Sequence, residues 1–479
     1  MTSTDLRALF DTQYQASREH VAVPLVVRRE RLLRMRKLLD EHSGTLAAAV
    51  EADFGVRSQR LTEVADMFVL HTLIGHTLKH LARWSRPQKV RTPLYLLPAS
   101  ARIERQPLGV VGVISPWNYP IQLALAPAIT ALAAGNRVMI KPSELTPHTS
   151  AQLDRLLAQF FTPDEVCVVQ GDAAVASAFA ALPFDHLVFT GSTAVGRKVA
   201  QAAAANLTPT TLELGGKSPC IIDADCRLED AALKIAHGKL LNAGQTCIAP
   251  DYVLVPRGSE SAFADAYKAA VAKLFPTIAG NKDYASIISP RHLARLRTML
   301  QQAQTQGAQV LSMDPAPGQS VAPASAVLDG ATSRQMAPVL VLGATSAMQL
   351  MQEEIFGPIL PVISYDRLDD AVAHINAGPR PLALYWFGNS DSVRDGVLAR
   401  TVSGGVTVND TLMHIAHDNL PFGGVGDSGW GAYHGEQGFL RFCHQKSVLI
   451  QSRWSLGSVF YPPYGARLDS TLKLLRRII

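Results

Sequence analysis

Residues 212–219 read LELGGKSP and residues 244–250 read GQTCIAP, and one strand-like run and one helix-like run separate these two loops. The run at residues 219–222 is apolar and predicts a buried strand. Residues 228–241 are rich in Ala, Leu and Lys and predict a helix. A strand followed by a helix takes the chain across the sheet and then brings it back to the edge where the strand began. We therefore expect the second loop to face the first.

The two loops carry a thiol and a carboxylate. Cys247 lies in a flexible Gly/Thr loop, and Glu213 lies beside paired glycines. A thiol can attack a carbonyl carbon, and a carboxylate can activate the water that later releases the acyl group. An isolated cysteine is more often a small buried hydrophobe. The rest of the chain therefore has to decide between the catalytic and the structural interpretation.

Predicted strands and helices alternate on both sides of this stretch. On the N-terminal side the predicted strands cover residues 109–115, 137–140, 166–169 and 186–189, and the predicted helices cover residues 121–134 and 174–181. On the C-terminal side the predicted strands cover residues 252–255, 287–288, 360–365, 382–387 and 405–409. Repeated β-α units of this size predict parallel sheets covered by helices on both faces.

The outer segments follow other patterns. Helical spacing covers residues 25–49 and 61–84. Residues 90–105 are irregular and contain two prolines, which predicts an extended arm that belongs to a subunit interface. Residues 447–451 predict a short strand. The basic, apolar end at residues 472–479 is expected to pack on the protein itself, with contact to a membrane surface as the alternative.

Composition limits the class of protein. A chain of 479 residues with 47% hydrophobic and 18% charged residues predicts two or three compact globular domains. The net charge of +5 is scattered along helices, which disfavours nucleic acid as a partner. Five cysteines without a C-x-x-C pair indicate neither a disulfide framework nor a metal site and fit a reducing cytoplasm. No secretory signal or bilayer-spanning run is evident.

The usual nucleotide-binding fingerprints are missing. The chain has no G-x-G-x-x-G turn, and residues 191–196 have P-loop spacing without the Lys-Ser/Thr pair that must follow it. A nucleoside triphosphatase is therefore disfavoured. What remains is a strand that opens through Gly191 and Ser192 into a helix, whose free N–H groups can bind a phosphate. Many such turns carry Gly and Ser for geometry alone.

Lys141 and Glu144 lie just past the end of a predicted strand, at the edge where parallel sheets bind ligands. Lys can donate to ribose hydroxyls or phosphate, and Glu can accept from a ribose 2′-hydroxyl. The same residues also fit a helix N-terminus, with Ser143 as the cap and Glu144 as an acid favoured by the helix dipole. Spacing alone leaves both interpretations open.

Taken together, these motifs make the chain resemble the aldehyde dehydrogenase superfamily, and within it the class-three-like branch. The matching residues are 117–120 (WNYP), 141–144 (KPSE), 189–192 (FTGS), 212–219, 244–247, 353–358 (EEIFGP) and 421–426 (PFGGVG). They occur in the family's order across nearly the whole chain, so the resemblance is highly specific.

The resemblance implies an α/β fold with a Rossmann-like cofactor domain, an α/β catalytic domain and a small bridging arm. The expected ranges are 1–89 and 106–213 for the cofactor domain, 214–410 for the catalytic domain, 90–105 and 440–479 for the arm and tail, and 411–439 for a segment that returns to the cofactor domain. Relatives of this branch are commonly homodimers, so we expect a homodimer.

The resemblance also assigns roles. Cys247 would be the nucleophile, Asn118 would hold the oxyanion together with the Cys247 N–H, and Glu213 would activate water. The implied cofactor is NAD, since Glu144 would repel a 2′-phosphate, although members of this branch often accept NADP as well. The residues expected to bind it are Lys141, Glu144, Gly191, Ser192, Gly196, Glu354 and Phe356. No metal is expected.

Substrate choice depends on the pocket walls that the resemblance indicates. Tyr119, Leu241, Met413 and Ile415 predict an apolar, partly aromatic slot without a basic residue. An aromatic aldehyde such as coniferyl aldehyde, oxidised to ferulate, is the expected substrate. A medium- or long-chain fatty aldehyde is the alternative. A coenzyme-A-acylating enzyme is disfavoured by Glu213, and a catalytically silent binding protein is disfavoured by the complete set of catalytic side chains.

Overall fold

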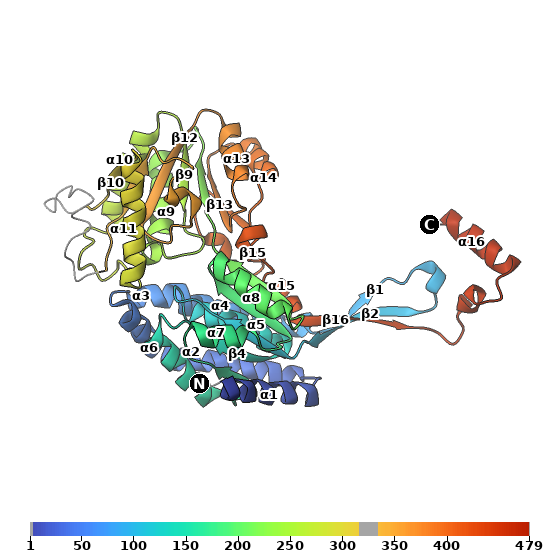
Figure 1. The fold of residues 1–479 in the computed structure, drawn as a ribbon. Coiled ribbons are helices and arrows are strands. Elements are labelled where there is room, and N and C mark those ends of the chain that lie inside the picture. The colour runs from blue at the N-terminus through green and yellow to red at the C-terminus, as the bar shows by residue number, and fades with distance from the viewer. Residues whose placement is uncertain (1–2, 316–333, 479) are drawn as a thin grey trace.

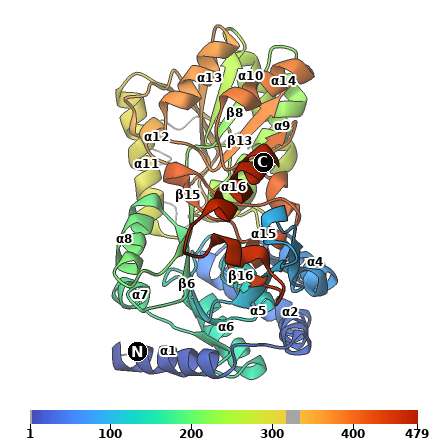
Figure 2. The same cartoon turned by 90° about the vertical axis from the view of Figure 1, so that its right-hand side faces the viewer.

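The computed structural model describes residues 3–315 and 334–478, arranged as two stacked lobes and a projecting arm (Figures 1 and 2). Each lobe is built on one sheet, and the arm is a third, three-stranded sheet. Residues 1–2, 316–333 and 479, which fall within the predicted domain ranges, lie outside the described residues. In the described part of the chain, no helix is both long and apolar enough to cross a bilayer.

The lower lobe in Figure 1 contains a six-stranded sheet with the order β15-β7-β6-β3-β4-β5. Its strands are β3 (Val110–Ile114), β4 (Arg137–Lys141), β5 (Val166–Val168), β6 (His186–Gly191), β7 (Thr210–Leu214) and β15 (Gly429–Trp430). All neighbours are parallel except β15, which runs antiparallel to β7. The four strands predicted on the N-terminal side of the Glu213 loop are therefore confirmed.

Helices cover this sheet. They are α1 (Ser3–Glu19), α2 (Leu25–Phe54), α4 (Phe68–Trp84), α5 (Gln122–Ala134), α6 (Pro147–Phe160), α7 (Ala173–Ala180), α8 (Thr193–Ala204) and α15 (Gly435–Arg441). The short α3 (Gln59–Thr62) and a π-helical turn (Glu63–Met67) lead into α4. Every residue of α5 is buried, because the helix packs between the sheet and α2 and α4. The apolar sequence of α5 therefore forms a helix that is buried in the core.

The upper lobe contains a seven-stranded sheet with the order β10-β11-β12-β9-β8-β13-β14. Its strands are β8 (Pro219–Ile222), β9 (Tyr252–Pro256), β10 (Gln309–Ser312), β11 (Val339–Leu342), β12 (Ile359–Tyr365), β13 (Ala383–Phe387) and β14 (Gly405–Val408). Its helices are α9 (Leu228–Leu240), α10 (Glu260–Leu274), α11 (Pro290–Thr305), α12 (Gln349–Gln352), α13 (Leu368–Ala377) and α14 (Asp391–Arg400). Only β10 is antiparallel to its neighbour.

The strand predicted at residues 287–288 is wrong. Ile287 and Ile288 are buried but belong to no strand. Their backbone N–H groups donate instead to the carbonyl of Arg334 and to the side chain of Gln245. The prediction failed because a buried irregular segment and a buried strand both appear in the sequence as a short apolar run.

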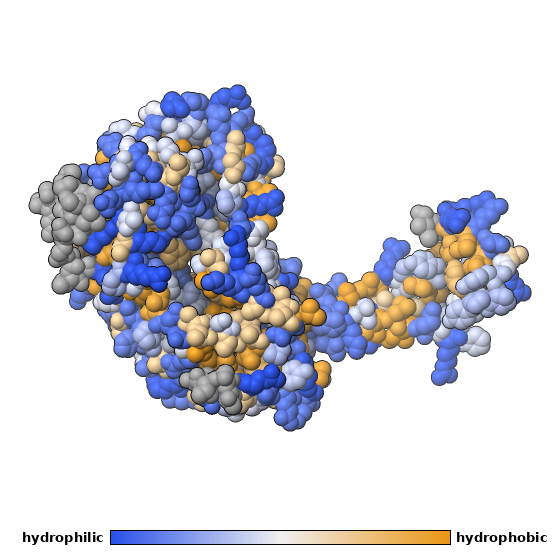
Figure 3. All heavy atoms as spheres, in the orientation of Figure 1, coloured by the Kyte–Doolittle hydropathy of each residue, from blue (hydrophilic) through white to orange (hydrophobic). Residues whose placement is uncertain are grey.

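The arm projects sideways from the lower lobe (Figure 1). It pairs β1 (Gln88–Val90) with β2 (Ser100–Pro107) and β2 with the long β16 (Cys443–Ile450), all antiparallel. The C-terminal helix α16 (Ala466–Ile478) lies at its outer end and contacts mainly the 3-10 turn Leu456–Phe460. The expectation that this end packs on the protein itself holds for that turn, although the end lies away from both lobes. Figure 3 shows apolar residues gathered along the arm and its tip.

Candidate active site

Two cavities meet at Cys247. The first measures about 570 Å³ and is lined by the loops at the carboxyl ends of the lower-lobe strands and by the segment of residues 352–356. The second measures about 480 Å³ and runs between α4, α5 and residues 411–434. Cys247, Glu213, Thr190 and Leu123 line both. The thiol and the carboxylate predicted to meet do therefore share one space, at the point where the two cavities join.

The loop that carries Cys247 is tightly constrained. After α9, Asn242 and Ala243 both take φ of +52°, and Gly244 takes φ of +78°. A Cβ on Gly244 would lie 2.3 Å from the carbonyl oxygen of Gly357, so only glycine fits there. The Gln245 side chain then bridges three backbone groups, donating to Asn242 and Ser286 and accepting from Ile288. The loop thus holds Cys247 in a fixed place.

The environment of Cys247 disfavours its thiolate. Burial, followed by the charges of Glu354 and Glu213, raises the pKa of the Cys247 thiol to about 12. Backbone N–H groups in the same loop oppose this shift only weakly. The free protein therefore holds this cysteine mainly as a neutral thiol, and a base must take its proton when it attacks.

Glu213 is a buried carboxyl group on β7. Neither of its carboxyl oxygens has a hydrogen-bond partner within the described ranges, and burial raises its pKa well above the usual range. A Cβ on Gly423 would lie 3.3 Å from Glu213 Oε1, so this glycine leaves room for the carboxyl group. A carboxylate with a raised pKa is a stronger base than an exposed one. Glu213 is therefore suited to accept a proton beside Cys247.

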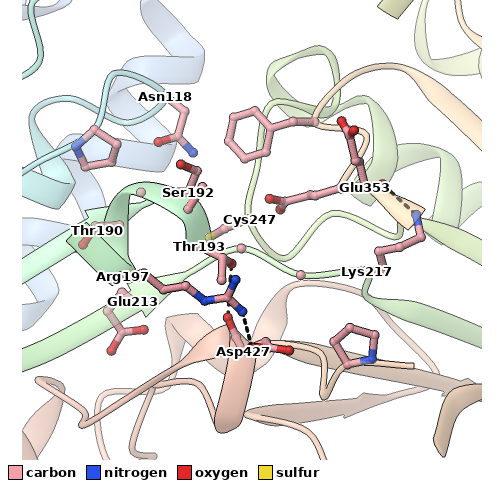
Figure 4. Close-up of a pocket in the computed structure, with 18 of the residues that line it drawn as sticks. Asn118, Thr190, Ser192, Thr193, Arg197, Glu213, Lys217, Cys247, Glu353 and Asp427 are labelled. Atoms are coloured by element: carbon pink, nitrogen blue, oxygen red, sulfur yellow. Dashed lines mark hydrogen bonds and ion pairs between the residues drawn. The ribbon is translucent and has the colours of Figure 1, made fainter. Parts of the chain in front are cut away.

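Asn118 faces the same space from the loop after β3, as Figure 4 shows. Its amide Nδ2 donates to the carbonyl of Gln245 over 3.2 Å, which ties the Asn118 loop to the Cys247 loop. The backbone carbonyl of Asn118 accepts from Arg57 and from Asn242. Arg57 is fully buried and forms an ion pair of 2.9 Å with Asp66. Two buried side chains thus position the amide beside the thiol.

Glu354 and Phe356 line the first cavity. A Cβ on Gly215 would lie 1.9 Å from Glu354 Oε2, so the glycine gives this carboxyl group its space. Burial, followed by the charge of Asp251, raises the pKa of Glu354 to about 8. The Phe356 ring stands edge-on to Trp117 at 5.4 Å, and its backbone takes φ of +52°.

A network of charged groups holds the loop that carries Glu354. Lys217 pairs with Asp251 and donates to the carbonyls of Leu350 and Glu353. Arg295 of α11 donates to the carbonyls of Glu354 and Ile355. Arg295 could not be predicted from the sequence, because its role depends on packing between α11 and a distant loop.

Gly191 and Ser192 also line the first cavity, at the N-terminus of α8. Ser192 caps the helix, since its hydroxyl accepts from the N–H of Val195. Arg197 of α8 pairs with Asp427 over 2.9 Å, an ion pair drawn in Figure 4. Gly196 does not line the cavity. A Cβ there would lie 2.5 Å from Leu214 Cδ2, so this glycine lets α8 approach the sheet.

Lys141 and Glu144 lie outside both cavities. Lys141 ends β4, is almost fully buried, and donates to the carbonyl of Pro142 over 2.8 Å, with Glu144 Oε2 at 3.4 Å. The alternative that Ser143 caps a helix is wrong, because α6 begins at Pro147 after Thr146. Ser143 instead accepts from the N–H of Leu145. Both side chains remain at the carboxyl edge of the sheet.

The second cavity is mostly apolar. Tyr119, Leu241, Met413 and Ile415, the side chains predicted to form the slot, all line it. The sequence did not single out several polar residues of this cavity. They include Thr72, His237, Asp418, Tyr433 and His434. No motif marked them, because three of the five come from the return segment and meet the site only through the tertiary fold.

The first cavity fits the nicotinamide end of a dinucleotide. The helix N-terminus at Ser192 suits a phosphate, and the buried acid Glu354 suits a ribose hydroxyl. In residues 3–315 and 334–478, no group of three or more His, Cys, Asp or Glu residues is arranged to hold a metal ion. The arrangement offers a thiol, a base and an amide donor around one point, next to a cofactor-sized cavity.

The comparison with known sequences decides the family. The profile described as "Aldehyde dehydrogenase family" matches residues 1–448. The chain belongs to the aldehyde dehydrogenase family. Members use NAD(P), so this aldehyde dehydrogenase is an NAD(P)-dependent oxidoreductase acting on aldehydes. The family resemblance and the α/β fold inferred from the sequence motifs are thereby confirmed.

Individual relatives are similar over almost their whole length. A "Probable coniferyl aldehyde dehydrogenase" from Pseudomonas aeruginosa is 47% identical over 467 residues, which cover 97% of this aldehyde dehydrogenase and 94% of the relative. A "Coniferyl aldehyde dehydrogenase" from a Pseudomonas species is 44% identical, covering 98% and 96%. The solved "Substrate bound state of Staphylococcus Aureus AldH" superposes with a TM-score of 0.90 at 35% identity, covering 98% and 99%.

Proposed function

We propose that this aldehyde dehydrogenase oxidises an aromatic aldehyde, with coniferyl aldehyde giving ferulate as the leading candidate. The observation that carries the proposal is the position of Cys247 between an apolar cavity and a cofactor-sized cavity. The aromatic and aliphatic walls of the apolar cavity suit a flat ring. The relatives from Pseudomonas, whose names specify coniferyl aldehyde, support the same choice.

In the first half of the proposed mechanism, the Cys247 sulfur attacks the aldehyde carbon and gives a thiohemiacetal. The Asn118 amide and the Cys247 backbone N–H stabilise the negative charge on the oxygen. The thiol proton passes to solvent through the cavity that Cys247 lines, so Glu213 remains free to act as the base in the second half. A nicotinamide held in the first cavity would supply the hydride acceptor, and loss of hydride would leave a thioester on Cys247.

In the second half, Glu213 removes a proton from the water that attacks the thioester. The carbon–sulfur bond breaks, the carboxylic acid leaves, and Cys247 is regenerated. A coenzyme-A-acylating reaction would pass the acyl group to a thiol and would not need this base. The buried, unpartnered Glu213 beside Cys247 therefore supports hydrolysis.

For the cofactor, the proposal assigns Glu354 and Phe356 to the nicotinamide ribose and ring and Gly191 and Ser192 to the pyrophosphate. Lys141 and Glu144 are assigned to the adenosine ribose, and Gly196 supports this site by letting α8 approach β7. The carboxylate of Glu144 disfavours a 2′-phosphate, which makes NAD the proposed cofactor over NADP.

The arm supports a proposal of a homodimer in a reducing cytoplasm. Leu94, Leu97, Leu449 and Ile450 on the arm are all exposed, and β1 and β16 leave the sheet with two open edges. Open edges and exposed apolar side chains favour association with a second chain. All five cysteines are free thiols, as a reducing compartment would keep them. Sedimentation as a 51.6 kDa monomer would contradict the dimer.

The experiment that tests the function measures reduced nicotinamide absorbance with NAD or NADP and a panel of coniferyl aldehyde, benzaldehyde, hexanal and decanal. The proposal predicts the highest kcat/KM with coniferyl aldehyde and NAD, and no turnover for Cys247→Ala. A preference for decanal would select the fatty-aldehyde alternative, which the apolar walls of the second cavity also admit. Turnover only after addition of coenzyme A would overturn the hydrolytic mechanism.

A further inference from the structure

The inner end of the apolar cavity contains polar atoms that lack partners. Within the described chain, Tyr433 Oη, Thr190 Oγ1 and both carboxyl oxygens of Glu213 are buried and form no hydrogen bond. All three side chains line the cavity that Cys247 also lines. An unpaired buried polar atom carries a free-energy cost of about 1–3 kcal/mol. Several of them around one reacting sulfur indicate groups that find their partners during the reaction.

Tyr433 lies deep in the cavity. Its side chain is 0% exposed, whereas Val64, Phe68 and Met413 of the same cavity are 64%, 62% and 48% exposed. The exposed residues mark the mouth, through which the tail of an aldehyde extends. The Tyr433 hydroxyl therefore lies toward the reacting end of the substrate. Glu213 and Cys247 both act on it electrostatically and, after burial, help to raise the pKa of its phenol.

The return segment fixes Tyr433 relative to Glu213. Gly429 of β15 is the backbone partner of Glu213 on β7, so Tyr433 follows the pairing by only four residues. Behind it, a Cβ on Gly438 would lie 2.0 Å from the Tyr433 carbonyl oxygen, which leaves the backbone no room to retreat. The Tyr433 ring also stands edge-on to His434 at 4.9 Å. Its side chain is thus held in the same cavity as the Glu213 carboxyl group, although the two groups form no hydrogen bond in this structure.

We propose that Tyr433 is a positioning residue for thioester hydrolysis, in which its hydroxyl donates a hydrogen bond to the ionised Glu213 carboxylate. This inference rests on the proposed function. The carboxylate must lose its proton to act as a base, and a buried carboxylate without a donor is strongly disfavoured. In residues 3–315 and 334–478, two buried hydroxyls that line this cavity have no hydrogen-bond partner, those of Tyr433 and Thr190.

The step that depends on Tyr433 is the attack of water on the Cys247 thioester. The water oxygen bonds to the acyl carbon while one water proton moves to Glu213. The carbon–sulfur bond then breaks, and the sulfur takes the proton back from Glu213. The products are the carboxylic acid and the Cys247 thiol. Tyr433 keeps its own proton throughout, as its raised pKa requires.

The test uses p-nitrophenyl acetate, which acylates a reactive cysteine without any cofactor. Release of p-nitrophenol in the first turnover reports acylation of Cys247, and the later steady rate reports hydrolysis of the acetyl thioester. For Tyr433→Phe we expect an unchanged burst and a steady rate reduced about ten- to a hundredfold, the loss expected for one hydrogen bond to a charged group. Acid quenching and mass measurement should then find acetylated Cys247 accumulating.

The matched control is Tyr267→Phe. Tyr267 is also fully buried with an unpartnered hydroxyl, but it lies in the core of the upper lobe and lines neither cavity. This variant should leave both the burst and the steady rate unchanged. A loss of steady rate in both variants, with the burst equally reduced, would show a general structural effect and overturn the proposal.

The pH profile gives a second readout. The titratable groups that interact with Glu213 are Cys247 from the loop after α9 and Tyr433 from the return segment. Loss of the Tyr433 donor should move the alkaline rise of the steady rate upward by about one pH unit. An unshifted pH profile and an unchanged steady rate for Tyr433→Phe would overturn the role of Tyr433 and leave the proposed function intact. Failure of the unmodified protein to form any acyl-Cys247 would overturn the proposed function itself.

Discussion

Alkylation of Cys247 by iodoacetamide should be slow at neutral pH and should accelerate about tenfold for each pH unit. The structure raises the pKa of this thiol from an ordinary value near 9 to about 12, chiefly by burial. A thiol pKa of about 12 in place of about 9 means roughly a thousandfold less thiolate at any pH below both values. Because a more basic thiolate is also more nucleophilic, the alkylation rate should fall by a smaller factor, about thirty- to sixtyfold.

The assay follows modification of the Cys247 peptide by mass spectrometry between pH 6 and pH 10, with free glutathione as the ordinary thiol in the same tube. We expect the protein-to-glutathione rate ratio at pH 7.5 to be about one in thirty to one in sixty, with no plateau below pH 10. A plateau between pH 8 and pH 9, or a rate equal to that of glutathione, would refute the reasoning.

Glu354→Gln tests the electrostatic part of this shift. The pKa of Glu354 is raised to about 8, so its carboxyl group is neutral below that pH and charged above it. Its charge then opposes ionisation of Cys247 only in the alkaline range. The variant should therefore react several-fold faster than the unmodified protein at pH 9.5 and at nearly the same rate at pH 6.5. An equal acceleration at both pH values would assign the effect to packing.

Three further outcomes follow from the site. Asn118→Ala should lower kcat about a hundredfold or more, with a smaller change in KM, because the oxyanion loses its amide donor; steady-state kinetics checks this. Glu144→Ala should raise kcat/KM for NADP relative to NAD by about tenfold, since one repulsive charge is removed; an unchanged ratio would remove Glu144 from the cofactor site. Arg57→Met should lower the free energy of unfolding by about 3–5 kcal/mol, because it leaves Asp66 buried and unpaired; denaturant titration checks this against Arg257→Met, whose ion pair is exposed.

The sequence could predict the elements that show regular periodicity. The strand and helix between Glu213 and Cys247 are β8 and α9, with bounds within one residue of those expected. The β-α units of the lower lobe were equally clear, because buried parallel strands are short apolar runs between helices. Strands β10 and β11 were missed, since they flank residues 316–333 and lack the strand-helix alternation that marked their neighbours.

The candidate site was predictable only where motifs carry it. Cys247, Glu213 and Asn118 stand in short motifs, and all three line the first cavity. Tyr433 and Arg57 could not be found, because a single tyrosine or arginine has no local pattern that indicates burial. Their significance depends on β15 pairing with β7 and on the ion pair to Asp66, which are contacts between distant parts of the chain.

The most direct test of the central claim is capture of the acyl group on Cys247. The Glu213→Gln variant is mixed with NAD and coniferyl aldehyde and quenched in acid within one turnover. The protein is then digested, and the mass of the Cys247 peptide is measured by mass spectrometry. The mechanism predicts one equivalent of reduced nicotinamide per site and a Cys247 peptide heavier by the feruloyl group, because the base that releases it is missing. Sustained turnover by this variant, or reduced nicotinamide without an adduct on Cys247, would contradict the covalent mechanism.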